Sequence, residues 1–163
     1  MTDHQPYIVD DAHGEHYHFM LGDSCERLAE LADDSIDFSA YSPPFDSMFT
    51  YSPTERDVGN CATRDEFLTH YRYIIDQKLR VTKPGRVSAV HCMQIPTLKS
   101  RDGHVGITDF RGQIVREHQA AGWIYYGEVT IDKNPQIQAV RTKAQGLMFA
   151  QLRRDSSRTR PAL

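Results

Sequence analysis

The sequence lacks several features that define whole classes of proteins. It has no run of about 18 apolar residues, the length that a membrane-spanning helix requires. Its N-terminus is not a basic stretch followed by an apolar one, so no secretory signal is visible. Only three cysteines occur in 163 residues, and no two of them form a Cys-x-x-Cys pair. An odd number of widely spaced cysteines argues against a disulfide framework. We therefore expect a cytoplasmic protein with no membrane partner.

The composition that remains is that of a globular protein. With 39% hydrophobic and 25% charged residues, the chain is neither wholly disordered nor a fibrous repeat. A length of 163 residues suits one domain. The net charge of −3 is unevenly distributed, because residues 1–40 hold ten acids and one base, whereas residues 141–163 hold six bases and one acid. Such a basic end either binds phosphate groups or is a solvated tail.

Residues 1–16 form a polar N-terminal segment that is rich in Asp and His. We expect it to be ordered only by contact with something else. His13, His16 and His18 suggest a metal site, but no cysteine accompanies them, and the segment that carries them is expected to be mobile. We therefore predict no metal.

Short apolar segments alternate with helix-like segments along the chain. Strands are predicted at 17–21, 36–41, 86–92 and 123–131, from their apolar and β-branched content. Helices are predicted after Asp23, after Thr63 with its capping partner Glu66, and from about 109 to 121. This order predicts an α/β fold with a mostly parallel sheet and helices on its faces. Ligands of such sheets bind beyond the carboxyl ends of the strands.

The segment Ser42-Pro43-Pro44-Phe45 lies at one of these carboxyl ends, and His91 lies at the next. Two prolines cannot continue a central strand, so the 36–41 strand must end before them. On its own, the segment is explained by a polyproline turn that closes the strand, with Phe45 in the core. His91 alone reads as a strand-end residue.

The surrounding sequence gives the motif a second interpretation. LGDS at 21–24 comes first, a short helix and DSID at 34–37 follow, and the strand then leads into SPPF at 42–45. This order resembles the amino-methyltransferases of DNA, which use S-adenosylmethionine and carry a (Ser/Asp/Asn)-Pro-Pro-(Tyr/Phe/Trp) motif. The resemblance is to the permuted members, in which this motif precedes the recognition region. It continues to about residue 160.

The resemblance implies a fold, a reaction and a set of site residues. The fold is a partial Rossmann-like methyltransferase sheet, with an irregular basic C-terminal segment. The reaction moves a methyl group from S-adenosylmethionine to an exocyclic amine of a flipped base in double-stranded DNA, cytosine N4 being favoured over adenine N6. The implied catalytic residues are Ser42, Pro43, Pro44 and Phe45; the implied cofactor-binding residues are Asp23, Ser42 and Pro43; and the implied DNA-binding residues are Tyr51, Arg56, Arg141, Lys143, Arg153 and Arg154.

The chemistry of the motif suits this reaction. The amine lone pair is delocalised into the base, so it must be drawn out of conjugation before it can accept a methyl group. Ser42 Oγ can accept one amine hydrogen and the Pro43 carbonyl the other, while Phe45 can stack on the base. Proline fixes φ, which sets the direction of the carbonyl in advance. Asp23 is explained equally well as a helix cap.

One element of the family is missing from the sequence. Permuted members carry a Phe-x-Gly-x-Gly cofactor loop late in the chain, and no such pattern occurs here. We therefore expect residues 17–135 to be the catalytic part of a methyltransferase domain and residues 136–163 a truncated recognition segment. The chain alone is expected to bind the cofactor weakly and to methylate little or no DNA. A complementing C-terminal half or a homodimer is a further expected partner.

Two other functions remain open. One is a non-catalytic DNA-binding remnant that has lost the cofactor loop. The other is a different nucleotide-dependent α/β enzyme, which is weakened by the absence of a Gly-x-Gly-x-x-Gly turn and of a phosphate-binding loop. The family resemblance is compatible with both a restriction–modification setting and phage self-protection.

Overall fold

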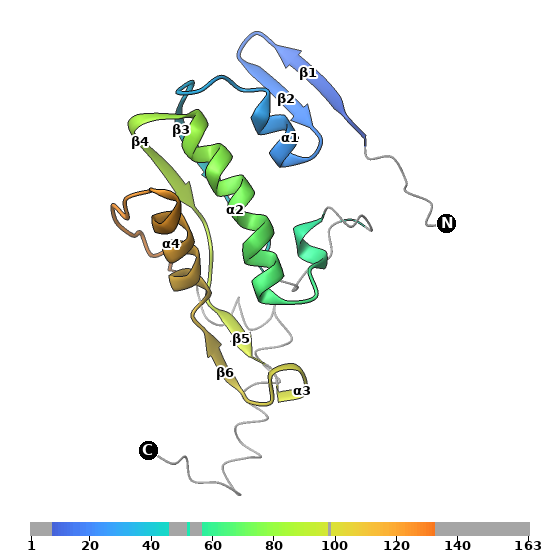
Figure 1. Cartoon of the computed structure of the whole chain (residues 1–163), viewed down its shortest axis with the longest axis vertical. Coiled ribbons are helices and arrows are strands. Elements are labelled where there is room, and N and C mark those ends of the chain that lie inside the picture. Colours follow the sequence, from blue (N-terminus) through green and yellow to red (C-terminus); the bar gives the residue numbers. More distant parts are fainter. Residues whose placement is uncertain (1–7, 46–51, 53–56, 98, 133–163) are drawn as a thin grey trace, which may run out of the picture. The chain divides into compact units, whose positions relative to one another are not determined.

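The computed structural model describes residues 8–45, 52, 57–97 and 99–132. The chain divides into two units. The first comprises Met1–Pro96 and Ile107–Tyr125, and the second comprises Thr97–Gly106 and Tyr126–Leu163. Most of the described elements belong to the first unit (Figure 1). Among the described residues, no helix has both the length and the apolar character that crossing a membrane would require.

A parallel pair of strands forms the centre of the first unit. β3 (Ile36–Tyr41) pairs with β4 (Thr82–Val90), and α2 (Arg64–Val81) precedes β4 in the chain. The register is regular from Phe38 opposite Val87 to Tyr41 opposite Val90, but it is irregular between Ile36 and Phe38. In Figure 1, α2 runs alongside the two strands. Because the strands are parallel, their carboxyl ends meet at one edge.

Local chemistry explains where α2 begins. Thr63 Oγ1 accepts a hydrogen bond from the Glu66 amide (3.2 Å), and Glu66 Oε2 accepts one from the Ala62 amide (2.8 Å). These bonds satisfy amide groups that have no partner inside the helix. One face of α2 is then buried, since Phe67, Tyr71 and Ile75 recur at helical spacing and are each 0% exposed.

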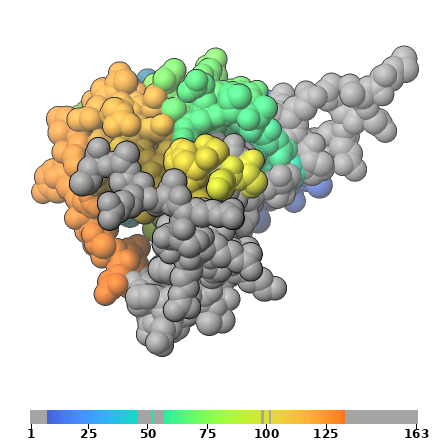
Figure 2. All heavy atoms as spheres, turned by 90° about the horizontal axis from the view of Figure 1, so that it is seen from below, coloured from blue at the N-terminus to red at the C-terminus, as the bar shows by residue number. Residues whose placement is uncertain are grey.

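α4 (Phe110–Ala121) packs against α2 and completes the core. Asp109 caps its first turn, and Gly122 ends it in the left-handed conformation with φ of 110°. Figure 2 shows the two helices as neighbours, with α4 in orange and the beginning of α2 in green. Phe110 and Ile114 of α4 join Ile95 and the buried face of α2 in a single cluster.

A β-hairpin and a short helix precede β3. β1 (Asp10–Gly14) and β2 (Tyr17–Leu21) pair antiparallel, and α1 (Ser24–Ala29) follows. A Cβ at Gly14 would lie 2.2 Å from the Tyr17 ring, so a larger residue at this position would displace that ring. The sequence predicted no strand in residues 1–16, yet Asp10–Gly14 of that segment is ordered as a strand by its pairing with β2.

Three small elements and one 3-10 turn complete the described structure. The turn η2 spans Val58–Asn60, and β5 (Ile95–Thr97) pairs with β6 (Gly106–Thr108). α3 (Lys99–Asp102) lies in the second unit. The described strands thus form three separate pairs rather than one mostly parallel sheet, and β3–β4 is the parallel pair among them.

One predicted strand is absent from the described residues, and the start of another is wrong. Residues 123–131 form no strand: Ile124 is 88% exposed and Val129 is 88% exposed, so their apolar side chains meet no neighbouring strand among the described residues. β4 begins at Thr82 rather than at residue 86, and it runs through Pro84 and Gly85. Gly85 has φ of 77°, which lies in the left-handed region and is compatible with the irregular register at this point.

Candidate active site at the end of the parallel strands

The SPPF segment (residues 42–45) leaves β3 beside the segment that leaves β4. The two strands remain paired to their last residues, Tyr41 and Val90. The amide of His91 then donates a hydrogen bond to the Tyr41 carbonyl at 2.8 Å. This bond extends the pairing by one step, so Ser42 and His91 emerge side by side. Both residues thus follow the carboxyl ends of their strands, as predicted, and the pairing brings them together.

Ser42 is exposed, and its hydroxyl hydrogen is already used. Ser42 Oγ donates to the His91 carbonyl at 3.0 Å and lies 3.4 Å from His91 Nδ1. A serine hydroxyl has one hydrogen to donate and two lone pairs that accept. Because the hydrogen points at a backbone carbonyl, Ser42 faces any incoming molecule as an acceptor. The sequence named His91 only as a strand-end residue and did not predict this bond.

The remaining residues of the segment are anchored to the core. Pro43 is buried, whereas Pro44 and Phe45 are half-buried. The Phe45 ring meets the His91 ring edge to face, with centroids 6.4 Å apart, and the Phe110 ring in the same manner at 6.3 Å. Among the described residues, no backbone amide donates a hydrogen bond to the Pro43 carbonyl. The segment therefore combines a fixed backbone with a carbonyl acceptor.

A buried hydrogen-bonded chain supports β3 directly behind Ser42. His118 Nδ1 donates to the Ile114 carbonyl (2.8 Å), so its Nε2 accepts from the Tyr41 hydroxyl at 3.1 Å. The Tyr41 oxygen in turn accepts from the Tyr71 hydroxyl at 2.5 Å. Burial raises the pKa of Tyr41 to about 12 and also raises that of Tyr71, while it lowers the pKa of His118. All three rings therefore stay neutral near pH 7.

Lys78 of α2 is buried against this chain. Its Nζ lies 3.2 Å from the centroid of the Tyr41 ring and donates to Ser88 Oγ at 2.8 Å. Ser39 Oγ donates to the same oxygen at 2.9 Å, so both acceptor positions of that hydroxyl are filled. With 7% of its surface exposed, Lys78 loses most of its hydration, and this burial lowers its pKa to about 7. The attraction of the cation to the ring offsets only part of that cost.

The free energy of unfolding is therefore expected to rise with pH between 7 and 9. In this range the unfolded chain binds a proton at Lys78, whose ordinary pKa is 10.5, more fully than the folded chain does. Deprotonation then favours the folded state, by up to about 1.4 kcal/mol per pH unit. Below pH 7 Lys78 is charged in both the folded and the unfolded state, so the cost of burying its charge no longer changes with pH. Above pH 9 the Cys25 thiol acts in the opposite direction, because burial raises its pKa.

Chemical denaturation at pH 7, 8 and 9 measures this effect. The substitution Lys78→Met is expected to remove the rise and to stabilise the protein at pH 7. Lys99→Met, at an exposed lysine of α3, is the matched control. The free energy of unfolding of this variant is expected to rise with pH as in the parent. A parallel rise in the parent and in Lys78→Met would show that another group titrates.

Of the other predicted site residues, Asp23 is the one in the described part of the chain, and it does not lie beside Ser42. Asp23 caps α1, since its Oδ1 accepts from the Cys25 amide at 2.9 Å. α1 is tied by Arg80 to the amino end of β3, whereas Ser42 lies at the carboxyl end. Six predicted DNA-binding residues fall outside the described residues: Tyr51, Arg56, Arg141, Lys143, Arg153 and Arg154.

Comparison with known proteins identifies related folds but no family. No family model matches the sequence, and no curated protein matches it. A candidate DNA modification methylase from Thermus thermophilus, solved in complex with S-adenosyl-L-methionine, superposes with a TM-score of 0.50 at 17% identity. That match covers 69% of this chain and 49% of the methylase. At this identity, the likeness shows a shared fold.

Two further structures of the same Thermus protein give similar values. One is a selenomethionine derivative, and each has a TM-score of 0.49 at 15% identity. Each match covers 69% of this chain, and 46% and 48% of the respective methylase chains. The chain thus spans about half the length of the structures that it resembles.

Proposed function

We propose that the chain provides the amine-binding part of a DNA methyltransferase that uses S-adenosylmethionine. Its reacting tip is SPPF at 42–45, and its substrate is an exocyclic amine of a flipped base, cytosine N4 being favoured over adenine N6. The observation that carries the proposal is the Ser42 hydroxyl, which is exposed at the end of a parallel strand and has its hydrogen occupied by His91. An amine requires such an acceptor.

The residues of the tip have separate roles in this proposal. Ser42 Oγ accepts one amine hydrogen and the Pro43 carbonyl accepts the other, which favours a pyramidal nitrogen with its lone pair free. Phe45 stacks on the base, and Phe110 and His91 hold its ring from two sides. S-adenosylmethionine, when bound, supplies an electrophilic methyl group on a sulfonium. The extra proton of the methylated nitrogen leaves to solvent, so no catalytic base is required.

The fit to S-adenosylmethionine rests on the oxygen atoms of the tip and on the shared fold. The oxygen atoms of the tip accept hydrogen bonds, which suits both the cationic sulfonium of S-adenosylmethionine and the amine that receives its methyl group. One Thermus methylase structure was solved with this molecule. The resemblance also implies Asp23 as a cofactor-side carboxylate; because α1, which Asp23 caps, is bonded to the amino end of β3 rather than to the tip, this role is tested separately below. The basic residues of 141–154 are proposed to bind DNA phosphates, so DNA affinity should fall as salt rises.

One face of the β3–β4 pair is apolar and exposed. Phe38 of β3 is 60% exposed, and its β4 neighbour Val87 is 48% exposed. Parallel sheets are ordinarily covered on both faces. We propose that a complementing polypeptide or a second copy covers this apolar face. Light scattering of the purified chain tests the second copy directly, since a monomer at all concentrations would exclude it.

Methyl transfer under single-turnover conditions tests the proposed function. The chain, supplied with the complementing C-terminal half proposed above, is held in excess over mixed-sequence duplex DNA with S-adenosylmethionine at a saturating concentration; the chain alone is expected to give little or no methylation. Mass spectrometry of the digested DNA is expected to detect N4-methylcytosine, or N6-methyladenine in the second form of the proposal. Salt-sensitive DNA binding without any methylated nucleoside would instead support a non-catalytic DNA-binding remnant.

Asp23 can be tested separately as a cap and as a cofactor-side carboxylate. Asp23→Ser retains an oxygen that caps α1 but removes the charge. We expect it to preserve the free energy of unfolding and to raise the dissociation constant for S-adenosylmethionine by about tenfold, because a hydrogen bond to a charged group is lost. Asp23→Ala is expected to lose about 1 kcal/mol of stability as well. If Asp23→Ser binds the cofactor like the parent, Asp23 is only a cap.

A further inference from the structure

A cluster of metal-binding side chains lies on the β1–β2 hairpin. It consists of Asp11 and His13 from β1 and His18 from β2. The candidate ligand atoms of the three residues all lie within 4.8 Å of one another. All three residues are exposed. The cluster is separate from the candidate site at the carboxyl ends of β3 and β4.

The hairpin register explains why these side chains meet. Residues two apart on a strand point to the same face, which places Asp11 beside His13. His13 lies directly opposite His18 across the pair, so His18 joins them on that face. Gly14 and Tyr17 follow in the same register and hold the far end of the hairpin, with the Tyr17 ring over the glycine. The cluster is thus fixed by strand pairing rather than by loop conformation.

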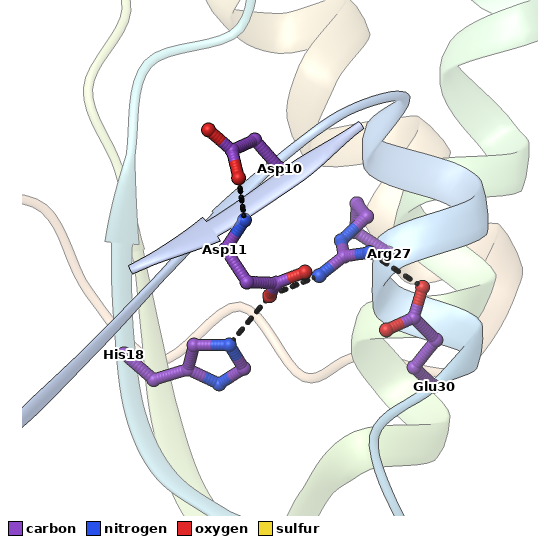
Figure 3. A network of polar contacts seen from close by, with 5 residues as sticks. All are labelled: Asp10, Asp11, His18, Arg27 and Glu30. Atoms are coloured by element: carbon purple, nitrogen blue, oxygen red, sulfur yellow. Dashed lines mark hydrogen bonds and ion pairs between the residues drawn. The ribbon is translucent and has the colours of Figure 1, made fainter. Parts of the chain in front are cut away.

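The side chains are already close to a coordinating arrangement. The rings of His13 and His18 are stacked, with centroids 4.0 Å apart and planes 18° from parallel. His18 Nε2 lies 2.6 Å from Asp11 Oδ1 (Figure 3). Around an ion with bonds of about 2.0–2.1 Å, tetrahedral ligand atoms lie about 3.3 Å apart. Small side-chain rotations on an exposed face are enough to reach that spacing.

A second layer of contacts orients the carboxylate. Arg27 of α1 donates to the same Asp11 oxygen that His18 contacts, and it pairs with Glu30 at 3.0 Å (Figure 3). The side chain of Arg27 is only 11% exposed, so it is a fixed support for Asp11. Its positive charge is offset by Glu30. Asp10 and Glu15 add further negative charge to the hairpin, which favours a cation.

We propose that Asp11, His13 and His18 form a binding site for a divalent transition metal ion of the zinc type. Two imidazoles and one carboxylate are ligands that Zn²⁺ accepts, and three protein ligands leave a fourth position for water or another group. The ion would tie β1 to β2 and stabilise a two-stranded hairpin, which is marginal by itself. This site differs from the prediction made from the sequence, which found no cysteine partner and therefore no metal.

Calorimetric titration of the untagged full chain with ZnCl₂, in a buffer that does not chelate, tests the site. The parent is expected to bind one Zn²⁺. His18→Ala is expected to raise the dissociation constant by at least about tenfold, because one ligand is lost. His16→Ala is the matched control. His16 lies in the turn that joins β1 to β2, its side chain is 86% exposed, and it is outside the cluster. This variant is expected to bind Zn²⁺ like the parent.

His13→Ala separates a metal site from an ordinary polar network. In an ordinary network of Asp11, His18 and Arg27, His13 contributes only its ring stacking, so its loss would leave Zn²⁺ affinity unchanged. In a metal site, His13→Ala weakens binding as strongly as His18→Ala does. Circular dichroism confirms that the variants fold. No Zn²⁺ binding by the parent, or equal binding by the parent and both variants, would overturn the proposal, independently of any methyl transfer.

Discussion

In the enzyme completed by its C-terminal half, replacing Ser42 with alanine is expected to lower the rate of methyl transfer to DNA by about 10²-fold, a loss typical of removing one fixed polar group from a reacting centre. The affinity for S-adenosylmethionine is expected to change little. Ser42 acts on the amine, because its hydrogen is donated to the His91 carbonyl and its oxygen retains the lone pairs that accept. Alanine removes this acceptor and leaves the proline-fixed backbone in place.

Single-turnover rates and cofactor titrations on the same protein preparations separate the two effects. Ser100→Ala is the matched control, because Ser100 is an exposed serine of α3 that belongs neither to the tip nor to the implied cofactor residues. It is expected to react at the parent's rate. Equal rates for the parent and for Ser42→Ala would remove Ser42 from the mechanism, and a matching loss of cofactor affinity would assign it to binding.

Replacing Phe110 with alanine is expected to lower the free energy of unfolding by about 3–5 kcal/mol. Phe110 is 0% exposed, and its ring lies 5.8 Å from that of Phe67, so its loss leaves a cavity at the junction of α2 and α4. The total stability of a domain is only about 5–15 kcal/mol, so this is a large fraction. The same ring supports Phe45 from one side, and its loss should also weaken the proposed stacking on the base.

Urea denaturation followed by circular dichroism measures the loss. Ile107→Ala removes an apolar side chain three residues earlier that is 69% exposed, and it is expected to change stability by less than about 0.5 kcal/mol. If Phe110→Ala destabilises the chain no more than Ile107→Ala does, the cluster around α2 and α4 is not the core of the first unit.

The elements that the sequence predicts well are those that local chemistry defines. Thr63 and Glu66 define the start of α2 through bonds within four residues. Asp109 and Gly122 bound α4 in the same way. β3 ends before Pro43, as the loss of an amide donor requires. Each of these signals acts over one turn or less, so neighbouring residues are sufficient to recognise it.

The elements that the sequence predicts poorly are those whose conformation depends on pairing with another segment. β1 is polar and exposed throughout, and it becomes a strand only because β2 pairs with it. Residues 123–131 have the composition of a strand but find no neighbour to pair with in the described part of the chain. β4 includes Pro84, which a local rule excludes from a regular central strand, because Gly85 and an irregular register accommodate it.

The candidate site was predictable in outline only. The positions of Ser42 and His91 follow from the carboxyl-end rule for parallel strands. The buried chain from Tyr71 through Tyr41 to His118 was not predicted, because it joins three elements that are far apart in sequence. Lys78 carried one usable signal: it follows Tyr71 by seven residues and Ile75 by three, which places it on the buried face of α2.

The bonds of Arg80 have a consequence for the order in which the chain acquires structure. α1 has six residues, too few to persist as an isolated helix in water. Its Leu28 carbonyl and the nearby Leu31 carbonyl are held by the Arg80 guanidinium, which follows Leu28 by 52 positions. During synthesis, α1 therefore emerges from the ribosome well before the group that secures it. In the nascent chain, α1 therefore becomes stable only after α2 has been synthesised. Until α2 has formed, the amide hydrogens of α1 should exchange with solvent.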